Sequence, residues 1–386
     1  MPLTSSLHYG ISLPENVRDA PSRQCREFPA RAAGGVGSLT RSAKFSCLSP
    51  GTCLDRGCYS PDVDRSLYAS NPSVRNSQGA AVSTDLRESA EQKLTLLLPK
   101  LRCPRSGEPL RLAGDRLENP SGTEAYGLVD GVPDLRAPPE RLHVDVPWYE
   151  PWDDLDTLRL AYPEPLDDPT LPYHLDGYLA SIVPADPAGC WIAEIGCGER
   201  QAEGWFSDRG MHYVGVDIDR RGPGPNVLGD AHNIPLASDS MDYCASMAVF
   251  EHVISPISFA REVHRVLKPG GTFFGSGVFV YGFHDRASFH HMSHAGLFYV
   301  LKVAGFQVEM MWPDWKYPDA VPAWGFRGGV GAPWRYMTKG CLSLAEWSFT
   351  RISNVARGIV GKPKIDLMMR DLSMAGSISF KAVKPG

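Results

Sequence analysis

The sequence predicts an α/β fold in which helices cover both faces of a doubly wound, mostly parallel sheet. A short apolar run at residues 191–195 is bounded by turn residues, as a buried parallel strand requires. A second such run at residues 213–217 ends in an acid. Residues 256–267 place Ile257, Ala260 and Val263 on one helical face, and a further strand begins near Thr272. Strands that alternate with helices favour a parallel sheet.

The first predicted strand, residues 191–195, runs directly into a glycine loop. Glu194 precedes Gly196 and Gly198, which allow a sharp turn and a close approach of a ligand to the main chain. We expect the next helix to point its first N–H groups at that ligand. A dinucleotide fingerprint needs a third glycine where this chain has Gln201. The pattern therefore favours a different nucleotide, although a glycine turn can follow any buried strand.

Acidic residues follow the next strands at an informative spacing. Asp217 lies about 20 residues beyond the glycine loop, where a ribose-binding carboxylate belongs. Asp230 and Ala231 come next, and then a fourth strand in residues 243–253, which runs into a loop and carries Met247. A helix closing with the Pro-Gly-Gly turn at residues 269–271 leads into the fifth strand.

As an ordered set, these motifs resemble the type-11 (ubiquinone/menaquinone-biosynthesis-like) domain of class I S-adenosylmethionine (SAM)-dependent methyltransferases. The resemblance covers roughly residues 169–308 and implies SAM as the cofactor. It also implies a Rossmann-like sheet of seven strands, in which the last strand, residues 377–383, is antiparallel beside the sixth, residues 306–310. The residues implied to surround the cofactor are Glu194, Gly196, Cys197, Gly198, Asp217, Ile218, Asp230, Ala231, Met247 and Phe250.

The candidate catalytic residues are Glu251 and His252, which leave the fourth strand at the edge where open α/β sheets bind ligands. His252 could act as general base for a hydroxyl or amine acceptor, or it could only orient the loop through hydrogen bonds. Tyr281 and His284 are expected on the same side. His290, His291 and His294 suggest a pocket wall or a helix cap rather than a metal site.

Composition limits the partners and the location. A net charge of -5 argues against a generally basic, nucleic-acid-binding surface. No apolar run approaches the ~18 residues of a membrane-spanning helix. The nine cysteines are scattered and suit a reducing, cytoplasmic location. Residues 1–85 lack periodicity and are interpreted as disorder, an organelle-targeting extension or an overlong reading frame.

A small β-rich module is expected at residues 86–140. The stretch around Cys103 and the Gly-Val-Pro turn at residues 131–133 resemble a zinc-ribbon-like module of the tRNA-methyltransferase-activator type. Ser106 stands where the second cysteine would be, and no further cysteine precedes Cys190. A structural zinc site needs four ligands, so the resemblance implies the fold without the metal. An ordinary pair of short strands is the alternative.

The remaining segments are divided as follows. Residues 141–168 are a linker or strap, residues 169–311 the SAM-binding core and residues 377–386 its final strand. A helix over residues 171–182 would carry Tyr173 and His174 as candidate cofactor-lid residues.

An aromatic-rich insertion is expected at residues 312–376, far longer than the usual connection of ~2–6 residues. Within it, Ser343 and Glu346 form a capping-box pattern that predicts a helix start. The insertion is interpreted as a substrate lid, a membrane-surface contact or a subdomain packed on the sheet edge.

The sequence thus predicts a SAM-dependent methyltransferase whose acceptor is a small molecule, such as a lipid-like quinone or a glycoside. The alternatives are an rRNA or tRNA methyltransferase, in which the N-terminal module would help, and a SAM-binding protein without catalysis.

Overall fold

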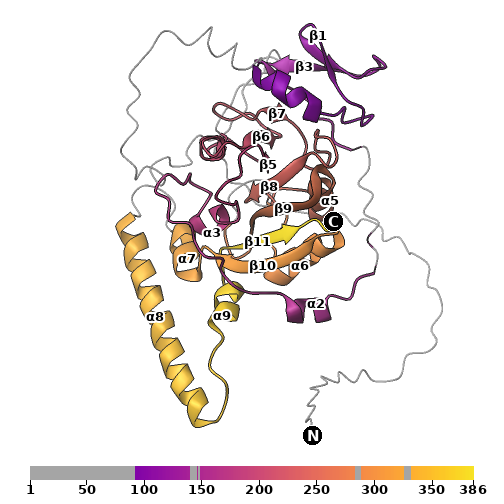
Figure 1. Ribbon diagram of the computed structural model, residues 1–386. Helices are drawn as coiled ribbons and strands as arrows, with labels where there is room; N and C mark the ends of the chain where they lie inside the picture. Colours follow the sequence, from indigo (N-terminus) through magenta and orange to yellow (C-terminus); the bar gives the residue numbers. More distant parts are fainter. Residues whose placement is uncertain (1–91, 140–145, 147, 283–287, 326–331) are drawn as a thin grey trace, which may run out of the picture. The chain divides into compact units, whose positions relative to one another are not determined.

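The computed structural model describes residues 92–139, 146, 148–282, 288–325 and 332–386, all within one compact unit (Figure 1). The expectations for residues 1–85, and that for His284, fall outside the described residues.

The centre of this unit is a seven-stranded sheet in the order β10-β11-β9-β8-β5-β6-β7. Its strands are β5 (Trp191–Ile195), β6 (His212–Asp217), β7 (Val227–Leu228), β8 (Met241–Met247), β9 (Leu267–Val278), β10 (Gln307–Asp314) and β11 (Ser377–Val383). Strands β5 to β9 pair in parallel, and β11 lies antiparallel between β9 and β10. The predicted doubly wound, Rossmann-like sheet with an antiparallel last strand is confirmed. Because β5 pairs with β6 on one side and β8 on the other, the topological switch point lies at β5.

Two helices pack against this sheet as their caps predict. Helix α5 (Pro256–Val266) follows Ser255, whose hydroxyl accepts the N–H of Ser258 at 3.3 Å. Helix α6 (His294–Val303) follows Ser293, whose hydroxyl accepts the N–H of Gly296 at 3.3 Å. The apolar faces of both helices are buried in the main core cluster.

Strand β9 begins five residues before the predicted start at Thr272. Met241 pairs with Leu267, and then the register jumps so that Tyr243 pairs with Thr272. Gly270 has a φ of +79°, which glycine adopts without strain. The Pro-Gly-Gly turn is therefore a bulge near the start of the strand rather than a separate turn before it.

The helix expected over residues 171–182 is wrong, because only α3 (Gly177–Ala180) is helical there. Asp176 caps it by accepting the N–H of Leu179 at 2.8 Å, so the helix begins at that point. The preceding turn contains Pro172, which has no N–H to donate.

The small β-rich region before the core is present. Residues 92–97 are helical and η2 (Leu98–Lys100) follows. An antiparallel sheet then forms in the order β1 (Arg111–Ala113), β2 (Arg116–Glu118), β3 (Ala125–Val129), β4 (Val132–Pro133).

This N-terminal sheet is joined to the free edge of the central sheet. Beyond β4, Asp134 bridges in parallel to Leu228 of β7, and the N–H of Leu135 donates to the Leu228 carbonyl at 2.8 Å. The guanidinium of Arg102 donates to Glu262 at 3.0 Å and to the Leu236 carbonyl at 3.1 Å. Backbone pairing and a half-buried ion pair therefore hold the two sheets together.

A strap crosses the opposite edge. After α2 (Trp152–Thr157), Leu160 bridges in parallel to Met311, and the Met311 N–H donates to the Arg159 carbonyl at 3.1 Å. The described part of the expected linker therefore behaves as a strap along β10.

The insertion between β10 and β11 begins later than expected, because β10 continues to Asp314. Trp312, counted above with the insertion, is fully buried in the sheet. The inserted residues form α7 (Tyr317–Gly325), α8 (Ala332–Ile359) and α9 (Leu367–Ser373). The capping-box prediction is wrong, because Ser343 lies inside α8. That helix starts earlier with Pro333 in its first turn, where a proline is tolerated. Among the described helices, none combines the length and apolar character needed to cross a bilayer.

Candidate functional site

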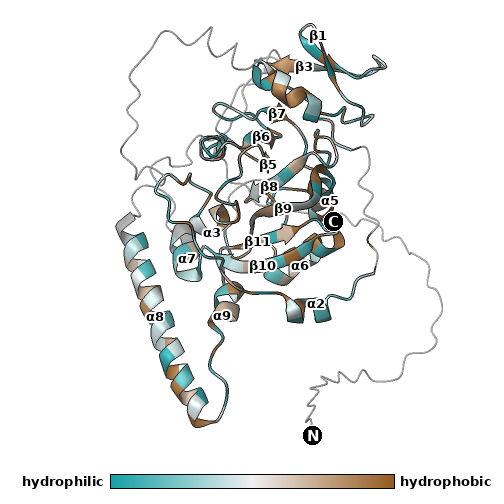
Figure 2. Ribbon diagram, in the orientation of Figure 1, coloured by the Kyte–Doolittle hydropathy of each residue, from teal (hydrophilic) through white to brown (hydrophobic). Residues whose placement is uncertain are grey.

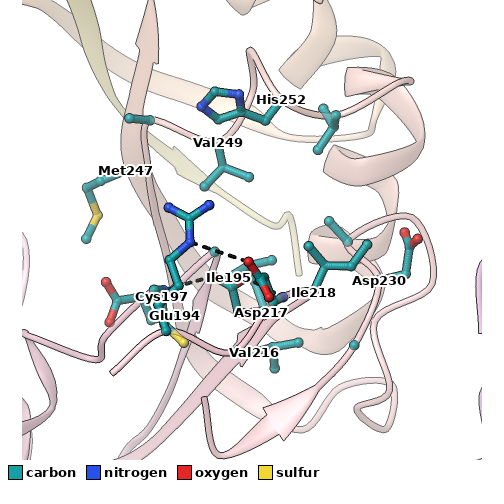
Figure 3. Close-up of a pocket in the computed structure, with 18 of the residues that line it drawn as sticks. Glu194, Ile195, Cys197, Val216, Asp217, Ile218, Asp230, Met247, Val249 and His252 are labelled. Carbon is teal, nitrogen blue, oxygen red and sulfur yellow. Dashed lines mark hydrogen bonds and ion pairs between the residues drawn. The ribbon is translucent and has the colours of Figure 1, made fainter. Parts of the chain in front are cut away.

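A cavity of about 820 Å³ opens at the carboxyl ends of β5, β6 and β8, at the switch point of the sheet (Figure 3). This is where open α/β sheets bind ligands. The lining includes nearly every residue that the sequence assigned to the cofactor: Glu194, Gly196, Cys197, Gly198, Asp217, Ile218, Asp230, Ala231 and Met247.

The glycine loop forms the floor of the pocket. Gly196 and Gly198 have φ angles of +76° and +52°, which favour glycine. A Cβ on Gly196 would overlap the side chain of Val249, whereas a Cβ on Gly198 would meet nothing within 4 Å. The main chain at Gly198 therefore faces open pocket space, so a ligand can approach it directly. Helix α4 (Glu203–Ser207) follows after a turn and has only five residues.

Asp217 joins the ends of the first two core strands. Its Oδ2 accepts the N–H of Gly198 at 2.9 Å, and its Oδ1 accepts the N–H of Asp219 at 2.9 Å. A carboxylate offers about four acceptor positions, so these bonds leave about two for a ligand. The side chain is thus fixed in orientation and can still accept two hydroxyl groups.

Glu194 is a buried acid, only 6% exposed, at the other side of the glycine loop. The hydroxyl of Tyr213 donates to its carboxylate. Burial raises the pKa of Glu194 to about 7, and the nearby Asp217 charge adds to this effect. The carboxyl is consequently near half-ionisation at neutral pH, and a cationic ligand would favour its charged form.

Asp230 is held by its neighbour His232. Its Oδ1 accepts the backbone N–H of His232 at 2.7 Å and lies 2.7 Å from the ring Nδ1. Burial alone would raise the pKa of Asp230, but the hydrogen bonds from His232 outweigh burial and lower it. The other ring nitrogen, Nε2, accepts the N–H of Ser255 at 3.2 Å, which assigns the Nδ1–H tautomer. The pocket wall is thereby tied to the first turn of α5.

The two candidate catalytic residues are placed differently. His252 lines the pocket, and Figure 3 shows it beyond Val249, on the far side from Asp217 and Glu194. Glu251 is fully buried and is not part of the lining. Burial raises the pKa of Glu251. Its Oε1 lies 3.8 Å from His252 Nε2, which is longer than a hydrogen bond. Only His252 can therefore contact a ligand directly.

Phe250 does not border the pocket as predicted. Strand β8 ends at Met247, and the chain then turns so that Phe250 packs against Phe259, with ring centroids 4.9 Å apart. It is fully buried in the main core. Of the two expected lid residues, His174 lines the pocket and Tyr173 does not.

Several lining residues had no sequence signal. Pro138 and Pro139 reach the pocket only because the segment after β4 pairs along β7. Phe289 arrives because its N–H donates to the Glu251 carbonyl at 2.6 Å. The lining residues without a predicted role include Pro138, Pro139, Val249, Val253, Ile254 and Phe289.

His290, His291 and His294, for which a pocket wall was one predicted role, are not part of the lining. His290 Nε2 lies 3.2 Å from the Ile254 carbonyl, and Phe289 rather than a histidine completes the wall. Across the described residues, no group of three His, Cys, Asp or Glu side chains is arranged to hold a metal ion.

The core strands are similar in sequence to known methyltransferases. Residues 193–275 match the family described as Methyltransferase domain. The chain is 36% identical over 98 residues to an uncharacterized methyltransferase of Mycobacterium leprae (strain TN), covering 22% of this chain and 36% of that protein. It is 36% identical over 96 residues to one of Mycobacterium bovis (strain ATCC BAA-935 / AF2122/97), covering 22% and 38%. The chain thus spans little more than a third of the length of these relatives.

Among solved structures, the chain resembles a complex between the Haloferax volcanii Trm112 methyltransferase activator and a methyltransferase. The identity is 19%, the TM-score is 0.36, and the match covers 53% of this chain and 87% of that one. The stretch that matches the methyltransferase-domain family, residues 193–275, runs from β5 into β9 and includes many of the residues that line the pocket.

Proposed function

We propose that this chain is a SAM-dependent methyltransferase that acts on a small-molecule acceptor. The observation that supports it most is the meeting of the glycine loop, Glu194 and Asp217 in one pocket at the switch point. The hydrogen-bond acceptor positions left on the Asp217 carboxylate suit the two ribose hydroxyls of SAM. The main chain at Gly198, which faces open pocket space, suits the methionine end of SAM. Asp230 and Ala231 would face the adenine.

When bound, SAM supplies a methyl group on a positively charged sulfonium. The side chains then have to hold the acceptor in line and exclude water. His252, in the pocket lining, would accept a proton from a hydroxyl or amine acceptor. Glu251 would help to position the pocket wall, because its carbonyl accepts the N–H of Phe289.

The acceptor side of the pocket supports a small, partly apolar molecule. Val249, Val253, Ile254 and Phe289 line the region around His252. A lipid-like quinone or a hydrophobic glycoside fits such a wall better than a polyanion does. The chain's net charge of -5 also disfavours RNA, and the scattered cysteines suit a cytoplasmic location.

Residues 86–140 are proposed to be a zinc-free module of the activator type, followed by the SAM-binding core from residue 169. The sulfur of Cys103 lies 3.2 Å from the Tyr126 hydroxyl and accepts the Ser106 N–H at 3.3 Å, so the thiol has two hydrogen-bond partners within this region. Through Pro138 and Pro139, this module would complete the pocket wall in cis. An RNA acceptor remains the alternative that a zinc-bound module would support.

The first test is cofactor binding. We expect micromolar affinity for SAM, about -8 kcal/mol, and no measurable binding of NAD by calorimetry. Asp217→Ala should weaken SAM binding by about 1–3 kcal/mol because ribose hydroxyls lose their acceptor. Asp115→Ala, an exposed aspartate away from the pocket, is the matched control and should change nothing. Tight NAD binding, or equal effects of both substitutions, would refute the assignment.

A second test uses the titration of Glu194. A bound sulfonium favours the carboxylate, so the pKa of Glu194 should fall on binding and a proton should be released. SAM affinity should therefore rise as the pH increases through about 7. Without ligand the sign reverses: the folded pKa is raised, so unfolding free energy should fall as pH rises from 4.5 to about 7.

Calorimetry across this pH range, in buffers of different ionisation enthalpy, measures the released proton. Glu194→Gln should flatten the dependence, whereas Glu309→Gln on the distant strand β10 should preserve it. A pH-independent affinity for the unmodified protein would mean that the sulfonium does not lie near Glu194.

A further inference from the structure

Helix α8 presents its apolar side chains to solvent. Over its 28 residues, six apolar residues recur at spacings of three, four, seven or eight positions and therefore share one face, which we name the α8 stripe. Their exposed fractions run from 55% to 81%. The stripe consists of Trp334, Met337, Leu344, Ile352, Val355 and Ile359. Figure 2 shows hydrophobic positions alternating with hydrophilic ones along α8.

The opposite face of α8 makes polar contacts with the rest of the protein, and it also carries the exposed Tyr336 and Trp347. Thr350 Oγ1 accepts from Arg370 at 2.6 Å, and Asn354 Oδ1 accepts the Ile365 N–H at 2.8 Å. Lys339 forms an ion pair with Asp319 of α7. A helix that packs on its own core buries the apolar face instead. The orientation of α8 is therefore the reverse of that of an ordinary surface helix.

Charge identifies the kind of surface that would cover the stripe. Residues 332–364 contain six Lys or Arg residues and one Glu, a net charge of +5, within a chain of net charge -5. The guanidinium of Arg351 lies over the Trp347 ring, 5.0 Å from its centroid. A basic helix with Trp, Leu and Ile on one face is typical of segments that lie in the plane of a bilayer interface.

We propose that α8 binds the surface of a lipid bilayer that contains anionic lipids, with the α8 stripe inserted at the boundary between headgroups and acyl chains. Two copies of this chain facing each other through the stripe would bring two segments of charge +5 together, which is unfavourable. An anionic lipid surface instead complements that charge. This proposal is independent of the cofactor assignment, because it concerns only the insertion.

Flotation of the full-length protein with vesicles tests the proposal without SAM. One set of vesicles is phosphatidylcholine, and the other contains equal parts of phosphatidylcholine and phosphatidylglycerol. We expect flotation with the anionic vesicles, weakened by added salt. The double variant Leu344→Gln/Val355→Gln should reduce vesicle affinity at least about tenfold, because both side chains are exposed and belong to the stripe.

The matched control is Leu112→Gln/Val129→Gln, the same pair of substitutions at exposed positions outside α8, which should float as the unmodified protein does. Arg351→Gln/Lys362→Gln/Lys364→Gln should lose about 100-fold on anionic vesicles, since each basic residue contributes about fivefold. The proposal would be overturned if the protein did not float with anionic vesicles, or if both Gln pairs lost the same vesicle affinity. It would also be overturned if light scattering showed a dimer that only the α8 pair of substitutions dissociates.

Discussion

Replacing Trp312 by alanine is expected to lower the free energy of unfolding by about 3–5 kcal/mol. Trp312 is fully buried and packs in a core cluster with Leu175, Leu179 and Ile192. Removing the indole would leave a large cavity in this cluster, on one face of the sheet. Chemical denaturation, followed by tryptophan fluorescence and circular dichroism, gives the difference directly.

Two further variants make this test specific. Trp334→Ala is the same substitution on the exposed face of α8 and should change stability by less than about 0.5 kcal/mol. Trp312→Phe keeps most of the buried volume and removes an indole N–H for which the described residues offer no hydrogen-bond partner, so it should cost far less than alanine. If Trp312→Ala left stability unchanged but impaired methyl transfer, Trp312 would belong to a lid, as the sequence suggested.

The parallel sheet and the cofactor half of the pocket could be predicted because their signals are local. Each strand is a short apolar run, and the acid or glycine at its end is the residue that lines the pocket. Gly198 and Asp217 illustrate this, since neighbouring strand ends meet at one edge of the sheet. The caps Ser255 and Ser293 were equally local, because a cap bonds to a residue three positions away.

The rest depends on pairing between segments distant in sequence. Pro138 enters the pocket because Leu135 pairs with Leu228, and nothing in either segment alone specifies that pairing. Phe250 shows the opposite case: the sequence predicted it at the pocket, but β8 ends at Met247 and Phe250 packs in the core against Phe259. The orientation of α8 was also inaccessible, because periodicity locates an apolar face without saying whether the protein covers it.

Replacing His252 by alanine is expected to lower the methyl-transfer rate by about 10²–10⁴ if His252 is the general base. His252 lines the acceptor side of the pocket, on the far side from Asp217 and Glu194 (Figure 3), so SAM affinity should be nearly unchanged. Transfer of labelled methyl from SAM is measured on an extract of a deletion strain, in which the unmethylated acceptor accumulates, and SAM affinity by calorimetry.

The alternative, that His252 only orients the loop, predicts a different pattern. His252→Gln retains a hydrogen-bonding side chain but cannot take up a proton at neutral pH. If His252 is the base, His252→Gln should be about as slow as His252→Ala, and both variants should lose the acidic limb of the pH–rate profile. If His252 only orients the loop, His252→Gln should recover most of the transfer rate, and the acidic limb should remain. The matched control is His212→Gln, which should keep the full rate, because the His212 ring packs at a tilt against Trp191 and lies outside the pocket lining.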